Sequence, residues 1–137
     1  MRVCAVLPRI VHDTELTKLH QDLLTVKNLG VQEALIGNIG LLIPVRECGL
    51  RARGDFGLNL YNSASINCAR DLQLRSACLS FEMTLPQIRD VSKGVPCELL
   101  VYGRLPLMIT ENCLIRGRTG PVVMASVALP AHLRATI

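Results

Sequence analysis

The amino-acid sequence predicts an α/β fold, a partial (β/α) barrel of about five parallel strands joined by short helices. Three observations predict it. Half of the 137 residues are hydrophobic but only 3% are aromatic, with no Trp, so the core would consist of Leu, Val, Ile and Ala, as in parallel sheets. Short apolar runs alternate along the chain with segments of helical periodicity. This alternation stops after about five strands, whereas a closed barrel needs eight units and roughly 200 residues or more.

Apolar periodicity and capping residues define the first unit. Val3–Leu7 is a short apolar run and is expected to form a buried strand. A helix with an apolar stripe, capped by Asp13 or Thr14, follows this strand and ends at Gly30. Glu33–Ile36 then forms the second strand. These segments together make one strand–helix–strand unit with a right-handed crossover.

The middle of the chain contains shorter elements. A brief helical turn is expected after Gly37–Gly40. The third strand is expected around Asp55–Asn59. A helix capped by Asn62 or Ser63 then runs to about Leu72.

Two further strands complete the predicted sheet. Ser76–Ser80 is the fourth strand, a helix capped by Thr84 runs through Lys93, and Cys97–Tyr102 is the fifth strand. A half-barrel of this kind leaves two sheet edges and an apolar interior open. We therefore expect an interior part of a longer protein, which needs the missing remainder of the barrel.

Two regions are expected along the chain. Residues 1–120 form the partial barrel, and residues 121–137 are an atypical tail with no acidic residue and no clear periodicity. One interpretation of the tail is a final helix or strand that covers the sheet. The other is a missense or truncated segment that arose from a change of reading frame.

Charge and cysteine usage narrow the class of protein. The net charge is +4, from 15 basic and 11 acidic residues, and the basic residues are scattered as on a solvated surface rather than gathered for RNA. No apolar run approaches the roughly 20 residues of a membrane span, and no signal peptide is visible. The six cysteines show no C-x-x-C spacing. We expect a reduced, cytoplasmic protein with no membrane partner.

Polar residues at or beyond the predicted strands are the candidates for catalysis. Parallel strands place their carboxyl ends at one rim, where α/β barrels carry their chemistry. The candidate catalytic residues are Asp55, Glu82 and Glu111. Two carboxylates at one rim could act as general acid and base, or hold a metal that activates water. Alternatively, Asp55 and Glu82 cap the following helix or turn.

The candidate substrate-binding residues are Asn38, Asn59 and Arg104. The two asparagines either hold loop backbones or contact the substrate, since rims use Asn for both. The planar guanidinium of Arg104 could clamp a carboxylate or phosphate. It could equally form a structural ion pair with Glu98 or Glu111.

Three blocks of sequence carry a family resemblance. They are Arg53–Ser63 (Arg-Gly-Asp-Phe-Gly-Leu-Asn-Leu-Tyr-Asn-Ser), Ser76–Glu82 (Ser-Ala-Cys-Leu-Ser-Phe-Glu) and Val101–Ile115. With these blocks, the chain from Val3 to Gly120 resembles the collagenase-like peptidase family of unknown catalytic type, number thirty-two. The likeness is greatest to the large branch with extra C-terminal domains, so the resemblance implies an interior fragment of such a protein.

The resemblance also implies a metal ligand. The family signature is matched by Glu98, Gly103, Leu105 and Cys113, while Pro106 stands where the first signature cysteine is expected. In relatives with an iron–sulfur cluster the two signature cysteines are implicated as ligands. The resemblance therefore implies that Cys113 is a metal ligand and that the full-length protein holds an iron–sulfur cluster. Proline cannot ligate iron and a cluster needs about four thiolates, so this chain is not expected to assemble one alone. A buried, inert thiol is the alternative for Cys113.

The function that the resemblance implies is that of a hydrolase acting on peptide bonds, with a peptide or protein as substrate. An alternative is hydroxylation of RNA or of a quinone precursor, linked to iron–sulfur chemistry. A third interpretation is an inactive, truncated remnant with no chemistry of its own.

Overall fold

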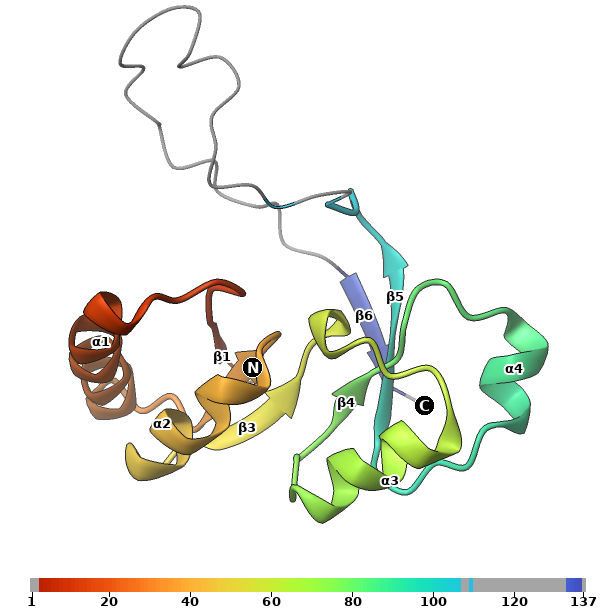
Figure 1. The fold of residues 1–137 in the computed structure, drawn as a ribbon, viewed down its shortest axis with the longest axis horizontal. Helices are drawn as coiled ribbons and strands as arrows, with labels where there is room; N and C mark the ends of the chain where they lie inside the picture. The colour runs from red at the N-terminus through yellow and green to blue at the C-terminus, as the bar shows by residue number, and fades with distance from the viewer. Residues whose placement is uncertain (1–2, 107–108, 110–132, 137) are drawn as a thin grey trace, which may run out of the picture.

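Five parallel strands with short helices form a half-barrel, as the sequence predicts. The computed structural model describes residues 3–106, 109 and 133–136. The strands are β1 (Cys4–Val6), β2 (Glu33–Ile36), β3 (Arg51–Gly54), β4 (Ala77–Cys78) and β5 (Cys97–Tyr102). They follow one another across the sheet in chain order, each parallel to the next. The carboxyl ends of β3 and β5 point toward the same edge of the molecule (Figure 1).

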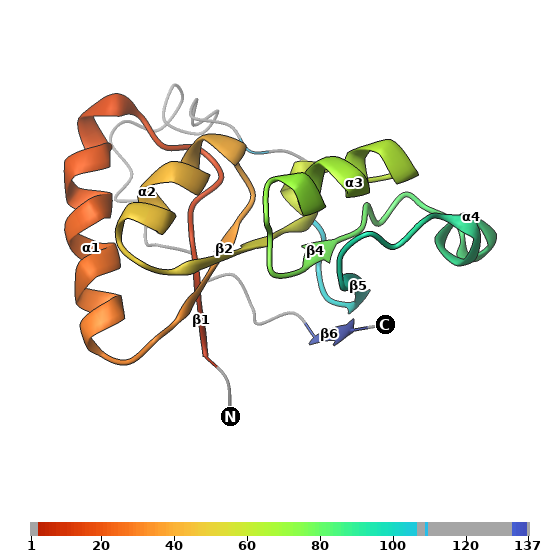
Figure 2. The same ribbon diagram turned by 90° about the horizontal axis from the view of Figure 1, so that it is seen from below.

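The connections between strands are short helices and 3-10 turns. They are η1 (Asp13–Glu15), α1 (Leu16–Asn28), η2 (Ile39–Leu41), α2 (Leu42–Glu47), η3 (Phe56–Leu58), α3 (Ser63–Asp71) and α4 (Leu85–Asp90). The helices α1, α2 and α3 lie along one side of the curved sheet (Figure 2). Small residues on that side allow the helices to approach closely: Ala34 pairs in register with Ala52, Gly54 pairs with Ala77, and all three alanines are fully or almost fully buried.

The hydrophobic core lies between these helices and the sheet. Leu23 of α1, Val45 of α2 and Ile66 of α3 are at most 1% exposed and belong to the same apolar cluster as Ile36 and Leu79. By contrast, α4 buries no residue completely. The core is therefore aliphatic, as the composition predicts, and it is continuous under the first three helices.

The third strand differs from the prediction. It spans Arg51–Gly54, and Asp55–Asn59 forms a 3-10 turn instead, which ends with Asn59 in the left-handed region (φ 51°). The segment that forms the strand contains two arginines, Arg51 and Arg53. In the structure their side chains pair with Glu33 and Glu98, so the segment is a strand with charged residues on one side only.

The first predicted cap is also displaced. The turn η1 begins at Asp13, so His12 occupies the capping position rather than Asp13 or Thr14. The Oε2 atom of Glu15 accepts a hydrogen bond from the His12 amide at 3.0 Å, which is one half of a capping box.

The later caps agree with the prediction. The Oδ1 atom of Asn62 accepts a hydrogen bond from the Ser65 amide at 2.8 Å and begins α3. Thr84 stands at the start of α4, where its amide donates to Oε1 of Gln87 at 2.8 Å. The helix α4 ends at Asp90, earlier than expected.

A sixth strand joins the sheet from the tail of the chain. Residues of β6 (Leu133–Thr136) pair antiparallel with β5, with Leu99 opposite Ala135. The two strands lie beside each other in both views (Figures 1 and 2). The interpretation of residues 121–137 as a missense or truncated segment stays a prediction.

The side of the sheet that faces away from α1–α3, here called the inner face, carries a buried ionic network. Glu33 and Glu98 are 5% and 2% exposed. The Nη1 atom of Arg53 donates to Oε2 of Glu33 at 3.1 Å, and its Nε donates to Oε1 of Glu98 at 3.1 Å and to Oγ of Ser76 at 2.9 Å. The Ser76 hydroxyl also donates to Glu98. Glu98 is thus paired with Arg53, which leaves the predicted pairing of Glu98 with Arg104 without support.

Burial and charge oppose each other at Arg53. Burial lowers the pKa of its guanidinium, but the hydrogen bonds and charges of Glu98, and then of Glu33, outweigh burial and raise this pKa overall. The guanidinium therefore remains charged and compensates both carboxylates.

Candidate functional site

A cleft of about 800 Å³ lies at the carboxyl ends of the parallel strands. We call it the rim cleft. It is lined by Arg9 and Ile10 after β1, Gly37, Asn38 and Ile39 after β2, Phe56, Gly57, Leu58 and Asn59 after β3, Ser80, Phe81 and Glu82 after β4, and Pro106 and Ile109 after β5. Every strand of the half-barrel therefore contributes the segment that follows it, as in an α/β barrel with its site at this rim.

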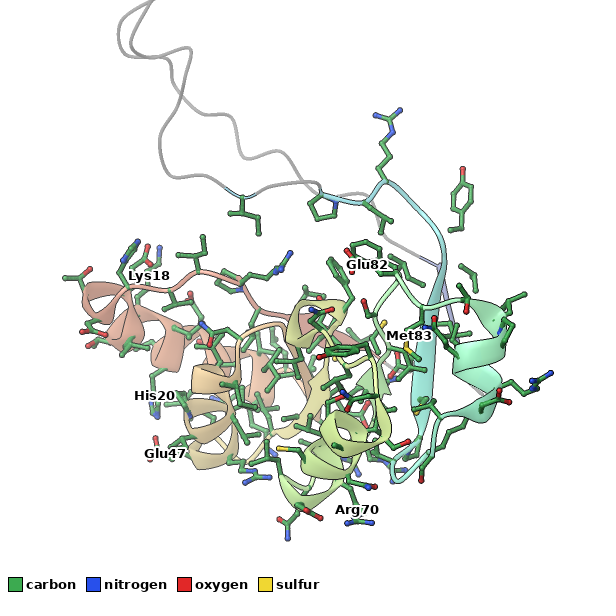
Figure 3. All side chains as sticks on the ribbon, turned by 45° about the vertical axis from the view of Figure 1, so that its right-hand side comes forward. Lys18, His20, Glu47, Arg70, Glu82 and Met83 are labelled. Carbon is green, nitrogen blue, oxygen red and sulfur yellow. The ribbon has the colours of Figure 1, made fainter. Side chains whose placement is uncertain are left out.

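A second hollow of about 400 Å³ adjoins the rim cleft. It shares Asn59, Ser80 and Glu82 with the cleft and extends to Tyr61, Met83 and Gln87. Figure 3 shows Glu82 and Met83 near the rim, with Glu47 and Arg70 at the opposite end of the molecule. The side chain of Glu82 thus stands where the two hollows meet.

Three of the predicted site residues line the rim cleft, namely Asn38, Asn59 and Glu82. Glu82 is exposed, and its amide donates to the Ser80 hydroxyl at 3.4 Å. Thr84 rather than Glu82 caps the following helix. The sequence argument therefore placed these residues correctly at one rim, while their chemical roles stay predictions.

Asn38 holds two loops together. Its Oδ1 accepts from the Gly40 amide at 2.9 Å, and its Nδ2 donates to the carbonyl of Arg9 at 3.3 Å. The segment after β1 is thereby fixed to the segment after β2. This is the backbone role that the sequence suggested for the rim asparagines.

Asp55 lies beneath the cleft wall rather than on it. Its side chain is buried, at 7% exposure, and its Oδ1 accepts a hydrogen bond from the Phe56 amide at 2.8 Å. The same residue donates its own amide to the carbonyl of Ile36 at 2.8 Å. Asp55 therefore begins η3, which was the alternative interpretation of this residue from the sequence.

The remaining predicted residues do not join this group. Arg104 follows β5, is exposed, and is absent from the described lining of the rim cleft. Glu111 and Cys113 lie outside the described residues.

Sequence reasoning missed an aromatic and cationic part of the cleft. The guanidinium carbon of Arg9 lies 5.2 Å from the ring centroid of Phe56, within the range of a cation–π contact. The rings of Phe56 and Phe81 meet edge to face, with 5.8 Å between centroids. Arg9 could have been found by the argument that found Asn38, because each follows its strand by two or three residues.

Two glycines make room for the Arg9 side chain. A Cβ atom at Gly37 would lie 2.9 Å from Cγ of Arg9, and one at Gly57 would lie 2.8 Å from its Nε and from the carbonyl oxygen of Gly37. Real Cβ atoms are not found at such distances. Glycine at both positions therefore leaves the space that the Arg9 side chain occupies in the lining of the cleft.

Comparison with known proteins identifies the family. A family model described as Peptidase family U32 matches residues 1–120. The chain belongs to this family. Searches of curated proteins and of solved structures gave no match. The match confirms the resemblance that the sequence blocks indicate, and it spans the whole rim cleft.

The iron–sulfur cluster that the family resemblance implies does not fit the described part of this family member. Its described cysteines are spread over the molecule, with Cys78 and Cys97 buried in the sheet, Cys48 buried after α2 and Cys68 exposed on α3. Within the described residues, no three His, Cys, Asp or Glu side chains gather in a way that could hold a metal ion. Cys113, the predicted ligand, lies outside this part.

Two of these buried thiols are held in their neutral form. Burial, and secondarily the charge of Glu47, raises the pKa of Cys48. Burial also raises the pKa of Cys97, while the charge of Lys93 lowers it to a smaller extent. A thiolate is the form that ligates metals, so these environments favour structural rather than ligating cysteines.

No helix in the described residues is both long and apolar enough to span a bilayer.

Proposed function

We propose that this member of Peptidase family U32 forms the substrate-binding rim of an enzyme that hydrolyses peptide bonds, with Glu82 as general base. The observation that carries the proposal is the position of Glu82 between two adjoining hollows. An extended peptide that crosses this junction would have side chains in both hollows and its backbone beside the carboxylate.

Four residues have proposed roles in the hydrolysis of the peptide bond. Glu82 would take a proton from a water molecule as the water attacks the carbonyl carbon of the peptide bond, and it would return that proton to the leaving amine nitrogen as the C–N bond breaks. Asn59 lines both hollows, and its side-chain amide could donate a hydrogen bond to a backbone carbonyl of the substrate. Asp55, through its hydrogen bond to the Phe56 amide, would position the turn that presents Asn59. Glu111 remains the proposed second carboxylate.

Glu82→Gln tests this proposal, with Glu47→Gln as the matched control. Glu47 ends α2, is exposed and lies far from the rim (Figure 3). Because general bases typically contribute about 10²–10⁴-fold, cleavage of denatured collagen should fall at least about 100-fold in Glu82→Gln. Glu47→Gln should cleave at the wild-type rate. Cleavage by Glu82→Gln at the wild-type rate would refute the assignment, and a wild-type protein that cleaves no peptide would refute the activity.

A further inference from the structure

Arg9 is held in a fixed position before any ligand arrives. Its backbone carbonyl is bonded to Asn38, its side chain crosses two glycines, and its guanidinium lies over the ring of Phe56. A side chain that is already ordered loses less conformational entropy when it binds a ligand. The arrangement is therefore that of a prepared binding group rather than of a solvated surface arginine.

The charge of Arg9 is not compensated within the part of the chain that the structure describes. None of the ion pairs found among those residues involves Arg9. The arginines on the inner face and on α3 and α4, by contrast, each have a carboxylate partner: Arg51, Arg53, Arg70 and Arg89. A guanidinium on an aromatic ring in a cleft is suited to a carboxylate, which it can bind through two parallel hydrogen bonds.

Apolar side chains flank this cation. Ile10, Ile39, Phe81 and Ile109 line the same cleft and are 42%, 50%, 43% and 47% exposed. Their exposed surfaces would be covered by aliphatic side chains on either side of the carboxylate. The described lining of the cleft thus contains one cation, Arg9 after β1, with apolar side chains beside it. The carboxylate of Glu82 lines the same cleft after β4.

We infer that Arg9 is a specificity-determining residue that selects peptides with an acidic side chain between aliphatic residues. That such a peptide is also a substrate rests on the function proposed above, whereas its binding does not. RNA is the less suitable ligand, because binding of a phosphate backbone needs several cations and the described lining of the cleft contains one.

Binding of two matched peptides to the wild-type protein tests the inference first. The probes are acetyl-Leu-Glu-Leu-amide and acetyl-Leu-Gln-Leu-amide, which differ only in the charge of the central residue. Isothermal titration should give at least about tenfold tighter binding of the glutamate peptide, as expected for charge-assisted hydrogen bonds. Equal affinity for the two peptides would overturn the inference, and so would tighter binding of a hexauridine RNA than of the glutamate peptide.

Variants then assign the selectivity to one arginine. Arg9→Gln should bind both peptides equally, while Arg75→Gln, at an exposed arginine in a hollow lined by residues near the amino ends of the strands, should keep the tenfold preference. A preference that survives in Arg9→Gln, or one that disappears in Arg75→Gln, would overturn the assignment.

The two proposals fail separately. Selective binding of the glutamate peptide with no hydrolysis of any peptide would refute the peptidase function and leave the role of Arg9 intact. Hydrolysis without a preference for the acidic peptide would do the reverse.

Discussion

Arg53 compensates two carboxylates that are almost completely removed from water. Its side chain is 23% exposed, while the side chains of Glu33 and Glu98 are 7% and 2% exposed. Arg51 also reaches Glu33, at 3.2 Å, but its own side chain is 56% exposed. The two arginines are two positions apart on the same strand and differ chiefly in burial.

This difference predicts unequal effects of two similar substitutions. Arg53→Met removes the buried cation from both carboxylates, so that Glu33 keeps only its exposed partner Arg51, and it should lower the free energy of unfolding by about 3–5 kcal/mol. Arg51→Met removes an exposed partner of one carboxylate and should cost about 0–1 kcal/mol. Urea unfolding followed by circular dichroism measures both values. A loss of stability as large in Arg51→Met as in Arg53→Met would contradict the assigned roles.

The buried thiols make a second prediction at this scale. Because burial raises the pKa of Cys48 and Cys97, the thiolate that reacts with iodoacetamide is scarcer at these positions in the folded protein. The stability linked to these raised pKa values is present below the pKa of an unfolded thiol, about 8.5, and is lost as the pH rises through the folded value.

At pH 8, Cys68 on the exposed face of α3 should therefore be alkylated before Cys48 and Cys97. Mass spectrometry of tryptic peptides after timed labelling measures the order. The same experiment in urea, where all three should react alike, is the control. Labelling of Cys97 as fast as that of Cys68 in the folded protein would show that the core of the sheet is open.

Among the elements, the turn η3 connects the core to the rim cleft. Asp55 begins it below the surface, Phe56 forms part of the floor of the cleft, and Asn59 ends it in a left-handed conformation. Asparagine tolerates this conformation better than most residues with a side chain. The buried cap at the start of the turn therefore fixes the positions of the cleft residues that the turn carries.

Two substitutions separate the capping role of Asp55 from a catalytic one. Asp55→Asn retains an oxygen that can accept from the Phe56 amide, whereas Asp55→Ala removes it and should cost about 0.5–2 kcal/mol. If Asp55 is only a cap, Asp55→Asn should cleave peptide at nearly the wild-type rate and melt at nearly the wild-type temperature. A large loss of cleavage in a fully stable Asp55→Asn protein would instead assign the carboxylate a direct part in the reaction.

Elements whose own residues are apolar were predictable from the sequence. The strand Glu33–Ile36 was predicted with the bounds that the structure has, and so was Cys97–Tyr102. The strand Arg51–Gly54 was missed, because its two arginines become suitable for a strand only when Glu33 and Glu98 lie across from them. That pairing depends on residues 20 and 45 positions away from Arg53, which local periodicity does not reveal.

In the candidate site, too, some features could be predicted from the sequence and others could not. The placement of Asn38, Asn59 and Glu82 at one rim follows from the parallel topology alone. The seat of Arg9 does not, because it requires Gly37 and Gly57 to be brought together from different loops. The sequence thus predicts which residues reach the rim but not which of them touch.

Across the whole molecule, the half-barrel exposes apolar surface at its first strand. Within the described residues β1 pairs only with β2, and Val3 and Val6 near its ends are 54% and 69% exposed. Exposed strand edges with apolar side chains favour pairing with another chain. A further part of the protein or a second copy would cover this surface.

This exposure predicts self-association of the isolated chain that depends on β1. Sedimentation velocity should show the average mass rising with concentration, and Val6→Lys should reduce the rise. Leu85→Lys is the control, because Leu85 is 77% exposed on α4, away from the strand edge. An equal effect of both lysine substitutions would indicate nonspecific association through exposed apolar residues rather than association through the edge of the sheet.

The edge-to-face pair of Phe56 and Phe81 offers an optical readout of events in the rim cleft. The chain contains no tryptophan, so an indole introduced by Phe81→Trp would be the sole emitter of its kind in the protein. Its ring would stand beside Phe56, the ring that Arg9 contacts from within the same cleft. A shift in its emission on titration with a peptide would then follow occupancy of the cleft directly, with no label attached to either molecule.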